Sequence, residues 1–371
     1  MTHTTDVAII GGGLAGLTAA LRLRALGFDV TLYESGGYPR HRVCGEFMSP
    51  ECSAVLNELG LGDAISRHQP ATITVVRITA PAGTTWNSPL PAAAIGLSRY
   101  AVDALMAEAA VALGVDLRTN TVVRDVQGTL DTGFTLVGNE KTSARVVIGA
   151  FGKRSRLDKS LSRRFRGQPA PFTGLKMHYD GPPLDGRVEL HTFPGGYCGI
   201  NEIEDGVANL CLLTETARVR EAGGIDGFVA WMRAQNPALD AWMADATLRL
   251  PRWEAISQVS FARREPVERD VLMTGDAAGL ISPLAGDGMG MAFESGLLAA
   301  DHAGAFLREE TTAAELRADY AAAWTHEFRN RLRLGRALQA AMLRPTMLNV
   351  GLGTLQAAPP IGRWLIAATR A

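Results

Sequence analysis

The chain has 371 residues, of which 47% are hydrophobic and 20% charged, and its net charge is −1 at neutral pH. This is the composition of a globular protein, and the length predicts about two domains rather than one core. Because the chain has no overall positive charge, we expect no nucleic-acid partner.

The four cysteines are too few for a disulfide scaffold and lack the paired spacing of a zinc site, so we expect no metal and a reducing, cytoplasmic setting. The N-terminus runs directly into a strand and has no pattern of a signal peptide. No apolar run approaches the ~18 residues that cross a bilayer. The sequence therefore predicts no integral membrane segment, and it leaves peripheral membrane contact open.

The first 34 residues predict a strand–helix–strand unit, with strands at 6–10 and 30–33 and a helix at 17–26. Between strand and helix, Gly11, Gly13 and Gly16 have the G-x-G-x-x-G spacing that brings backbone and a helix N-terminus against a pyrophosphate. Glu34 follows the second strand, 23 residues after Gly11, where a carboxylate can accept hydrogen bonds from ribose hydroxyls. The unit predicts a dinucleotide site.

The next part of the chain alternates between both kinds of element. Ser49 and Pro50 open a helix to about residue 59, residues 72–79 alternate as a strand does, and Arg99 begins a helix to about residue 113. Further strands are expected at 115–118, 121–126 and 134–137, and residues 146–149 read as a buried strand.

Four strand-like runs with turn residues between them, at 172–179, 187–192, 196–202 and 207–214, predict one antiparallel sheet that would form a wall for a substrate. On the first of these strands, alternation puts Lys176 and His178 on the same face. If that face meets a ligand, the two side chains could bind or deprotonate a phenol-like substrate. If it does not, they are ordinary solvent-facing residues. Helices are expected near 227–234 and 239–244.

A second glycine-rich segment runs from Gly275 to Gly290, after the strand-like residues 270–274. Asp276 could hold the ribityl hydroxyls of a flavin, while Gly288 and Gly290 open a helix whose N-terminus would stabilise negative charge on the reduced ring. The two segments together predict FAD. The remaining chain is mainly helical, with Pro345, Pro359 and Pro360 as breaks.

Cys44 lies between a basic stretch, Arg40-His41-Arg42, and Gly45. A thiol in that setting tends toward the thiolate and could act beside a flavin. A small residue that fills space beside the ring is the other interpretation.

The glycine fingerprint, Glu34, the loop from Pro39 to Gly45, Arg99 and the second glycine segment resemble the geranylgeranyl reductase family. That family belongs to the wider group of aromatic-hydroxylase-like (group A) FAD-dependent oxidoreductases. The resemblance implies that Arg99 pairs with the pyrophosphate and that Val123 offers its backbone to the adenine. The FAD contacts it implies are Ala15, Glu34, Cys44, Gly45, Arg99, Val123, Asp276, Gly288 and Met289.

The chain also departs from these relatives. Hydroxylases of the group carry an acid in a Gly-Asp-Gly sequence where this chain has Phe151, which argues against direct reduction by NAD(P)H, although NAD(P)H remains open as an external donor. Residues 196–201 lack the Trp and Phe-Pro of prenyl reductases, and the Trp-x-Trp-x-Ile-Pro sequence of tryptophan halogenases is absent.

The expected fold is α/β, with a discontinuous Rossmann-like FAD-binding domain (1–70, 95–160 and 262–310), an antiparallel substrate domain (71–94 and 161–261) and a helical C-terminal region (311–371). The expected function is a flavin monooxygenase of secondary metabolism that acts on an apolar or aromatic small molecule through a C4a-hydroperoxide, with Cys44, Lys176 and His178 as candidate catalytic residues. The alternatives are a reductase of prenyl C=C bonds, a flavoprotein that oxidises residues of a partner polypeptide, and a non-catalytic flavin-binding module.

Overall fold

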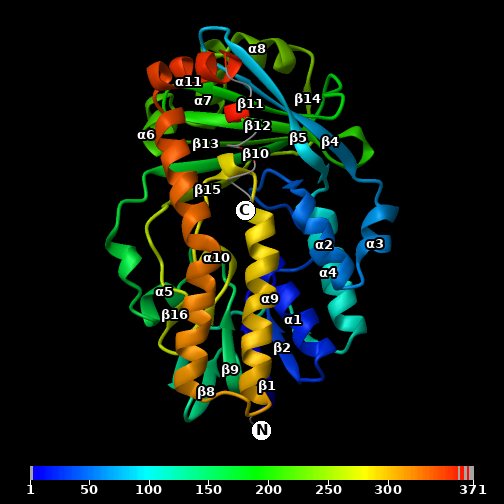
Figure 1. Cartoon of the computed structure of the whole chain (residues 1–371), viewed down its shortest axis with the longest axis vertical. Helices are drawn as coiled ribbons and strands as arrows, with labels where there is room; N and C mark the ends of the chain where they lie inside the picture. Colours follow the sequence, from blue (N-terminus) through cyan, green and yellow to red (C-terminus); the bar gives the residue numbers. More distant parts are fainter. Residues whose placement is uncertain (1–2, 358–359, 363–365, 367–371) are drawn as a thin grey trace.

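The chain forms two β-sheets, one in each half of the molecule, with helices packed on both (Figure 1). The structure is a computed structural model that describes residues 3–357, 360–362 and 366. The N-terminal strand and the helices α9 and α10 lie with the first sheet, and the second sheet occupies the other half (Figure 1). The predicted α/β fold is confirmed.

The first sheet is built on the apolar runs that the sequence marks as buried strands. Its central strands β17, β9, β1, β2 and β6 pair in parallel in that order, and β16 closes the edge in the antiparallel direction. The strands are β1 (His3–Ile10), β2 (Val30–Tyr33), β6 (Asp116–Arg118), β7 (Asp125–Thr129), β8 (Gly133–Val137), β9 (Lys141–Gly149), β16 (Val267–Glu268) and β17 (Val271–Met273). The helices packed on it are mainly α1 (Leu14–Ala25), α4 (Arg99–Ala112), α9 (Gly288–Leu307) and α10 (Ala313–Met342).

Parallel strands end at the same edge of a sheet, and here that edge is held by hydrogen bonds between the turns. The N–H of Gly11 donates to the carbonyl of Tyr33 at 2.8 Å, and the N–H of Ala150 donates to Ile10 at 2.8 Å. The N–H of Thr274 donates to the carbonyl of Gly149 at 3.0 Å. The turns after β1, β2, β9 and β17 therefore lie side by side.

The second sheet has the order β14-β10-β13-β12-β11-β4-β5-β3, with β15 also paired to β10. All its neighbours are antiparallel except β11 and β4. Its strands are β3 (Phe47–Met48), β4 (Ala71–Thr79), β5 (Thr85–Gly96), β10 (Phe172–Asp180), β11 (Arg187–Phe193), β12 (Gly196–Glu202), β13 (Ala208–Glu215), β14 (Thr247–Leu248) and β15 (Glu254–Val259).

The two faces of the second sheet have different partners. On β10, Leu175, Met177 and Tyr179 point into a core shared with α7 (Ile225–Gln235) and α8 (Pro237–Ala244). The other face turns toward the first sheet. Short helices complete this part of the chain: α2 (Pro50–Glu58), α3 (Gly62–Arg67), α5 (Leu157–Ser160) and α6 (Thr216–Glu221).

Two of the differences between the structure and the expected elements concern strands. Residues 121–124 form no strand, because this stretch crosses the edge of the first sheet. It forms a hydrogen bond with the loop after β2, in which the Thr121 N–H donates to the Glu34 carbonyl at 2.8 Å. The twelve-residue strand β5, which contains Pro89 and Pro91, was not expected. Prolines argue against a strand interior, but the pairing of β5 with β4 is irregular between Ile73 and Val75.

The C-terminal part is helical as far as it is described. After α10, Pro345 begins α11 (Pro345–Ala357), in agreement with the expected break, whereas Pro359 lies outside the described residues. Residues 358–359, 363–365 and 367–371 of the expected helical region lie outside them as well. Within the described chain, none of the helices has the length and apolar character needed to cross a membrane.

Candidate functional site

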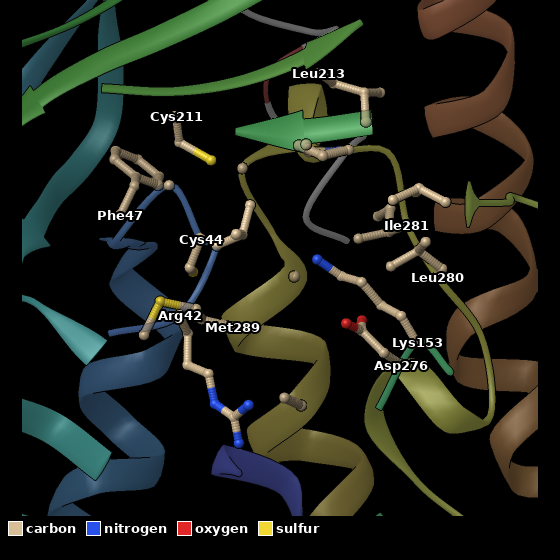
Figure 2. A pocket seen from close by; sticks show the side chains of 18 of the residues that line it. Arg42, Cys44, Phe47, Lys153, Cys211, Leu213, Asp276, Leu280, Ile281 and Met289 are labelled. Carbon is tan, nitrogen blue, oxygen red and sulfur yellow. The ribbon is translucent and has the colours of Figure 1, made fainter. Parts of the chain in front are cut away.

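Both glycine-rich segments line one cavity of about 1190 Å³ that lies between the strand edge of the first sheet and the inner face of the second. Figure 2 shows Cys44 and Phe47 on one side of it and Lys153 and Asp276 on the other, with Met289 at the start of α9 below Cys44. The convergence of two segments so far apart in the chain makes this cavity the candidate site.

In the first segment, two glycines are required by the packing of the protein itself. A Cβ on Gly11, whose φ is 109°, would stand 2.3 Å from the Ala150 carbonyl oxygen, and one on Gly16 would stand 1.9 Å from the Gly11 oxygen. Gly13 differs, since its Cβ would meet nothing closer than Nη2 of Arg99 at 3.7 Å. The space in front of Gly13 is open to the cavity, and α1 begins at the next residue with its free N–H groups.

Glu34 is buried beside this turn. Its carboxylate accepts hydrogen bonds from the N–H groups of Gly12 at 2.8 Å and Gly36 at 2.9 Å, and from Arg40 at 2.7 Å. Burial alone would raise the pKa of Glu34, but the Arg40 guanidinium outweighs it and lowers the pKa to about 2. The carboxylate is ionised at neutral pH and holds the glycine turn in place.

Arg99 begins α4 and reaches the cavity beside Gly13. Its Nε and Nη2 donate to the buried carboxylate of Asp103 at 2.6 and 2.7 Å. Burial would lower the pKa of Arg99, but Asp103 overcomes that effect and raises it. The guanidinium is a fixed positive charge at the position that the family resemblance assigns to a pyrophosphate contact.

In the second segment, Asp276 follows β17 and points into the cavity (Figure 2). Within the described chain its carboxylate has no hydrogen-bond or ion-pair partner. The turn is held from behind, where the Gly275 N–H donates to Oγ of Ser295 at 2.9 Å and a Cβ on Gly275 would lie 2.9 Å from that of Ala15. The free carboxylate therefore stands at a defined place in the cavity wall.

Helix α9 starts at this wall with Gly288 and Met289, and Asp287 precedes it. Asp287 is buried and lies 3.3 Å from Arg331 of α10, which also binds Glu294 at 2.7 Å. Burial raises the pKa of Asp287 to about 7, with Glu294 contributing in the same direction and Arg331 opposing it.

These features fit FAD. A Cβ on Gly45 would have no atom within 4 Å, and one on Gly288 would have none closer than 3.8 Å, so together with Gly13 they leave open backbone along the cavity. Two helix N-termini, the Arg99 cation and the unpartnered Asp276 carboxylate supply the donors, charge and acceptor that a diphosphate and a sugar alcohol need. Ala15 and Val123 also line the cavity.

The loop that carries Cys44 is anchored to the second sheet. Asn209 of β13 donates from Nδ2 to the carbonyls of Cys44 at 3.2 Å and Gly45 at 2.8 Å. The Cys44 sulfur accepts the N–H of Glu46 at 3.4 Å and faces the cavity (Figure 2). The structure thus brings Cys44 to the site, where both chemistry and packing beside a flavin are open to it.

Lys176 and His178 do not line the cavity, and they are not in solvent either. Both bind the fully buried carboxylate of Glu46: Lys176 through Nζ, and His178 through Nε2 at 2.8 Å. The Arg99 N–H donates to the same carboxylate at 2.7 Å. Burial would raise the pKa of Glu46, but Lys176 and His178 hold it below its usual value. In the structure, Lys176 and His178 hold the loop after Gly45 in place through Glu46.

Sequence reasoning missed Glu46, Arg42 and Lys153. Arg42 lines the cavity 3.7 Å from Glu34, and Lys153 lies opposite Cys44 (Figure 2). Arg42 was visible as part of the basic stretch before Cys44. Nothing in the sequence indicated that Glu46 would meet a lysine 130 residues further along the chain.

Comparison with known proteins identifies the family. Residues 4–323 match the family model described as FAD binding domain, so the chain belongs to this FAD-binding family and is an FAD-dependent oxidoreductase. It is 25% identical over 317 residues to a menaquinone reductase from Mycobacterium tuberculosis, covering 80% of this chain and 76% of that one. Geranylgeranyl reductases are also among its relatives, which confirms the resemblance found in the sequence.

Two further relatives have other activities. A rifampicin monooxygenase from Streptomyces venezuelae is 26% identical over 309 residues, with 78% of this chain and 62% of that one covered. The structure of CmlS, a flavin-dependent halogenase, superposes with a TM-score of 0.77 at 25% identity over 90% of this chain. This chain spans 63% of CmlS, less than two thirds of that halogenase.

We expect Asp276→Ala to weaken FAD binding at least about tenfold, because a hydrogen bond to a charged group contributes ~1.5–3 kcal/mol. The fold should survive, since the carboxylate supports no other described residue. Titration of the apoprotein with FAD measures the affinity. Asp226→Ala, an exposed aspartate on α7, is the matched control. An Asp276→Ala protein with wild-type FAD affinity would contradict this role.

Glu46→Gln should lower the free energy of unfolding by ~3–5 kcal/mol, because it leaves the buried Lys176 ammonium without its counter-charge. Adding Lys176→Met should recover part of that loss. Urea unfolding measures both variants, with the exposed Glu108→Gln as control. A loss below ~1 kcal/mol for Glu46→Gln would show that the pair does not stabilise the fold.

The raised pKa of Asp287 predicts a pH effect with a definite sign. Between the unfolded value of about 4 and the folded value of about 7, only the folded chain keeps the proton, so the free energy of unfolding falls as pH rises. From about pH 5 to pH 7, wild type should lose up to about 2 kcal/mol relative to Asp287→Asn. Chemical unfolding of both proteins across this window provides the test, and parallel curves would disprove it.

Proposed function

We propose that this FAD-dependent oxidoreductase is a monooxygenase of an apolar or aromatic small molecule. The observation that supports this proposal is the apolar compartment next to the flavin end of the cavity. Its walls come from the inner face of the second sheet and from the C-terminal helices, and their apolar lining includes Val76, Ile78, Trp86, Leu90, Val188, Leu190, Leu338, Met342, Leu352 and Leu355. We accordingly propose the segments 71–94 and 161–261 as the substrate domain.

The floor of this compartment is made of small side chains. Gly199 of β12 and Cys211 of β13 are paired in register in the middle of the sheet and both line the cavity. A Cβ on Gly199 would be in ordinary contact with Leu190 at 3.4 Å. The sheet therefore offers room above its centre, where a flat or chain-like apolar body can lie.

Each group of the chain has a proposed part in this reaction. The N-terminus of α1 and Arg99 hold the diphosphate, Glu34 and Val123 face the adenosine, and Asp276 accepts hydrogen bonds from the ribityl hydroxyls. The N-terminus of α9 would stabilise negative charge on the reduced flavin ring. FAD supplies the redox chemistry and the reaction with O₂ when it is bound.

The protein also excludes water and can accept a proton. The apolar walls keep bulk water away from the reacting groups. His41 lines the cavity, its ring 4.8 Å from that of Tyr100, and burial together with the nearby Lys176 charge lowers its pKa. A neutral imidazole at this place is the candidate proton acceptor.

A reductase of prenyl C=C bonds is the second candidate. The apolar compartment would suit a prenyl chain as well, and reductases are among the relatives. The helices α10 and α11 along the compartment disfavour oxidation of a partner polypeptide, which would need an open trough.

The flavin of this protein would receive its electrons from outside the cavity. Phe151 lines the cavity where hydroxylases of the group carry an acid, and its ring lies against Gly149. This favours an external donor, NAD(P)H or a partner reductase, over a built-in nicotinamide site.

The four cysteines are free thiols, which agrees with the proposed reducing, cytoplasmic setting.

Reduced, FAD-loaded protein should convert a panel of apolar phenols only in the presence of O₂ and should incorporate one atom of isotope-labelled O₂ into the product, which mass spectrometry detects. The same panel should include prenyl alcohols as reductase substrates. Full turnover under argon, with hydrogenated prenyl product and no label, would replace the monooxygenase by the reductase. Heat-denatured protein with added FAD is the control for uncatalysed oxidation.

A further inference from the structure

Lys153 brings a positive charge to the border between the flavin end of the cavity and the apolar compartment. It lies in the loop after β9, two residues beyond Phe151, where the chain departs from the hydroxylases. The residue is half-buried and lines the cavity. Figure 2 shows its side chain passing Asp276 and ending in the open middle of the cavity, on the side that faces Cys44.

This ammonium differs from three other cations in or beside the site in having no ion-pair partner among the described residues. Arg99 is paired with Asp103, Lys176 with Glu46, and Arg42 more distantly with Glu34. Among the described residues, Lys153 has no carboxylate within 4.0 Å and donates no hydrogen bond from Nζ. The neighbouring cavity cations Arg154 and Arg156 are exposed, so water can solvate them.

The backbone of Lys153 is held in place by a hydrogen bond from the buried side chain of Arg264. Arg264, which is buried, donates to the Lys153 carbonyl at 2.8 Å and to the Asp276 carbonyl at 2.9 Å. The Arg264 guanidinium is itself packed 4.1 Å from the centre of the Phe165 ring. One buried side chain therefore ties the backbone of Lys153 to that of Asp276, the proposed ribityl ligand.

Asp276 lies beside the Lys153 side chain but forms no ion pair with it within 4.0 Å, and the labelled side chains above them, Leu280, Ile281 and Leu213, are apolar (Figure 2). Leu213 and Leu280 belong to a buried apolar cluster that also contains Tyr197 and Val259. Cys211 faces it across the compartment, but burial raises the pKa of that thiol to about 12, so it is neutral. An ammonium at an apolar border without a counter-ion is costly unless a ligand supplies the negative charge.

We infer that Lys153 binds an ionised acidic oxygen of the substrate, and that the substrate is amphipathic: an apolar body with one carboxylate or phenolate. The acidic oxygen would sit beside Lys153, near the flavin, while the apolar body lies over Gly199 and Cys211. This deepens the proposed function and rests on it only for the location of the substrate. Lys153 would select the substrate and orient it.

The test uses FAD-loaded protein and two probes with the same chain length, decanoate and decanol, titrated by calorimetry under conditions without turnover. Wild type should bind decanoate at least about tenfold more tightly than decanol, the ratio expected from one charge-assisted hydrogen bond. Lys153→Gln should reduce that ratio to within about twofold while keeping its FAD. Lys159→Gln, an exposed lysine on α5, is the matched control and should keep the wild-type ratio.

The inference is overturned if wild type shows no preference for decanoate, if wild type binds neither probe, or if Lys153→Gln keeps the full preference. If Lys153→Gln instead loses FAD, Lys153 is a cofactor ligand and not a substrate ligand. Because probe binding needs neither O₂ nor an electron donor, failure of the monooxygenase proposal leaves this measurement intact, and the two failures can be told apart.

Discussion

The close packing of α1 against α9 is the constraint on which the site depends. A Cβ on Gly296 of α9 would stand 2.6 Å from the Ala15 carbonyl oxygen and 2.9 Å from Cβ of Thr18, so only a glycine allows the two helices to approach this closely. Both helices start at the same edge of the first sheet, because β1 and β17 run parallel with β9 between them. Their N-termini therefore face one cavity, and a single extended ligand can interact with both.

The second sheet is held to this edge by buried charge. Glu46 belongs to the loop after β2, whereas Lys176 and His178 belong to β10, and the three side chains meet in the protein interior. Such a cluster is costly to bury and strongly destabilising to break, so its value lies in fixing one arrangement of loop and sheet. Asn209 adds bonds to the carbonyls of Cys44 and Gly45. The wall of the cavity thus has a defined position relative to the compartment that would receive the substrate.

The fold could be read from the sequence to the extent that local patterns decide it. Buried parallel strands and the glycine fingerprint follow from apolar runs and turn residues, and the structure has both, together with the predicted helix start at Arg99. The strand β5 could not be predicted from the sequence, because its prolines argue against a strand. Its pairing with β4 becomes visible only in the folded sheet. The same holds for Lys176 and His178: alternation correctly put them on one face, but the burial of that face depends on Glu46, a residue far away in the chain. The unpartnered state of Lys153 is likewise a property of the assembled cavity.

The most direct test of the account is the titration of the apoprotein with FAD and, in parallel, with FMN. If both glycine-rich segments hold one ligand, each chain should take up one FAD, and FMN, which lacks the adenosine part, should bind much more weakly. Equal affinity for FMN would mean that the turn between β1 and α1 contributes nothing. A colourless protein that takes up neither would contradict the site altogether.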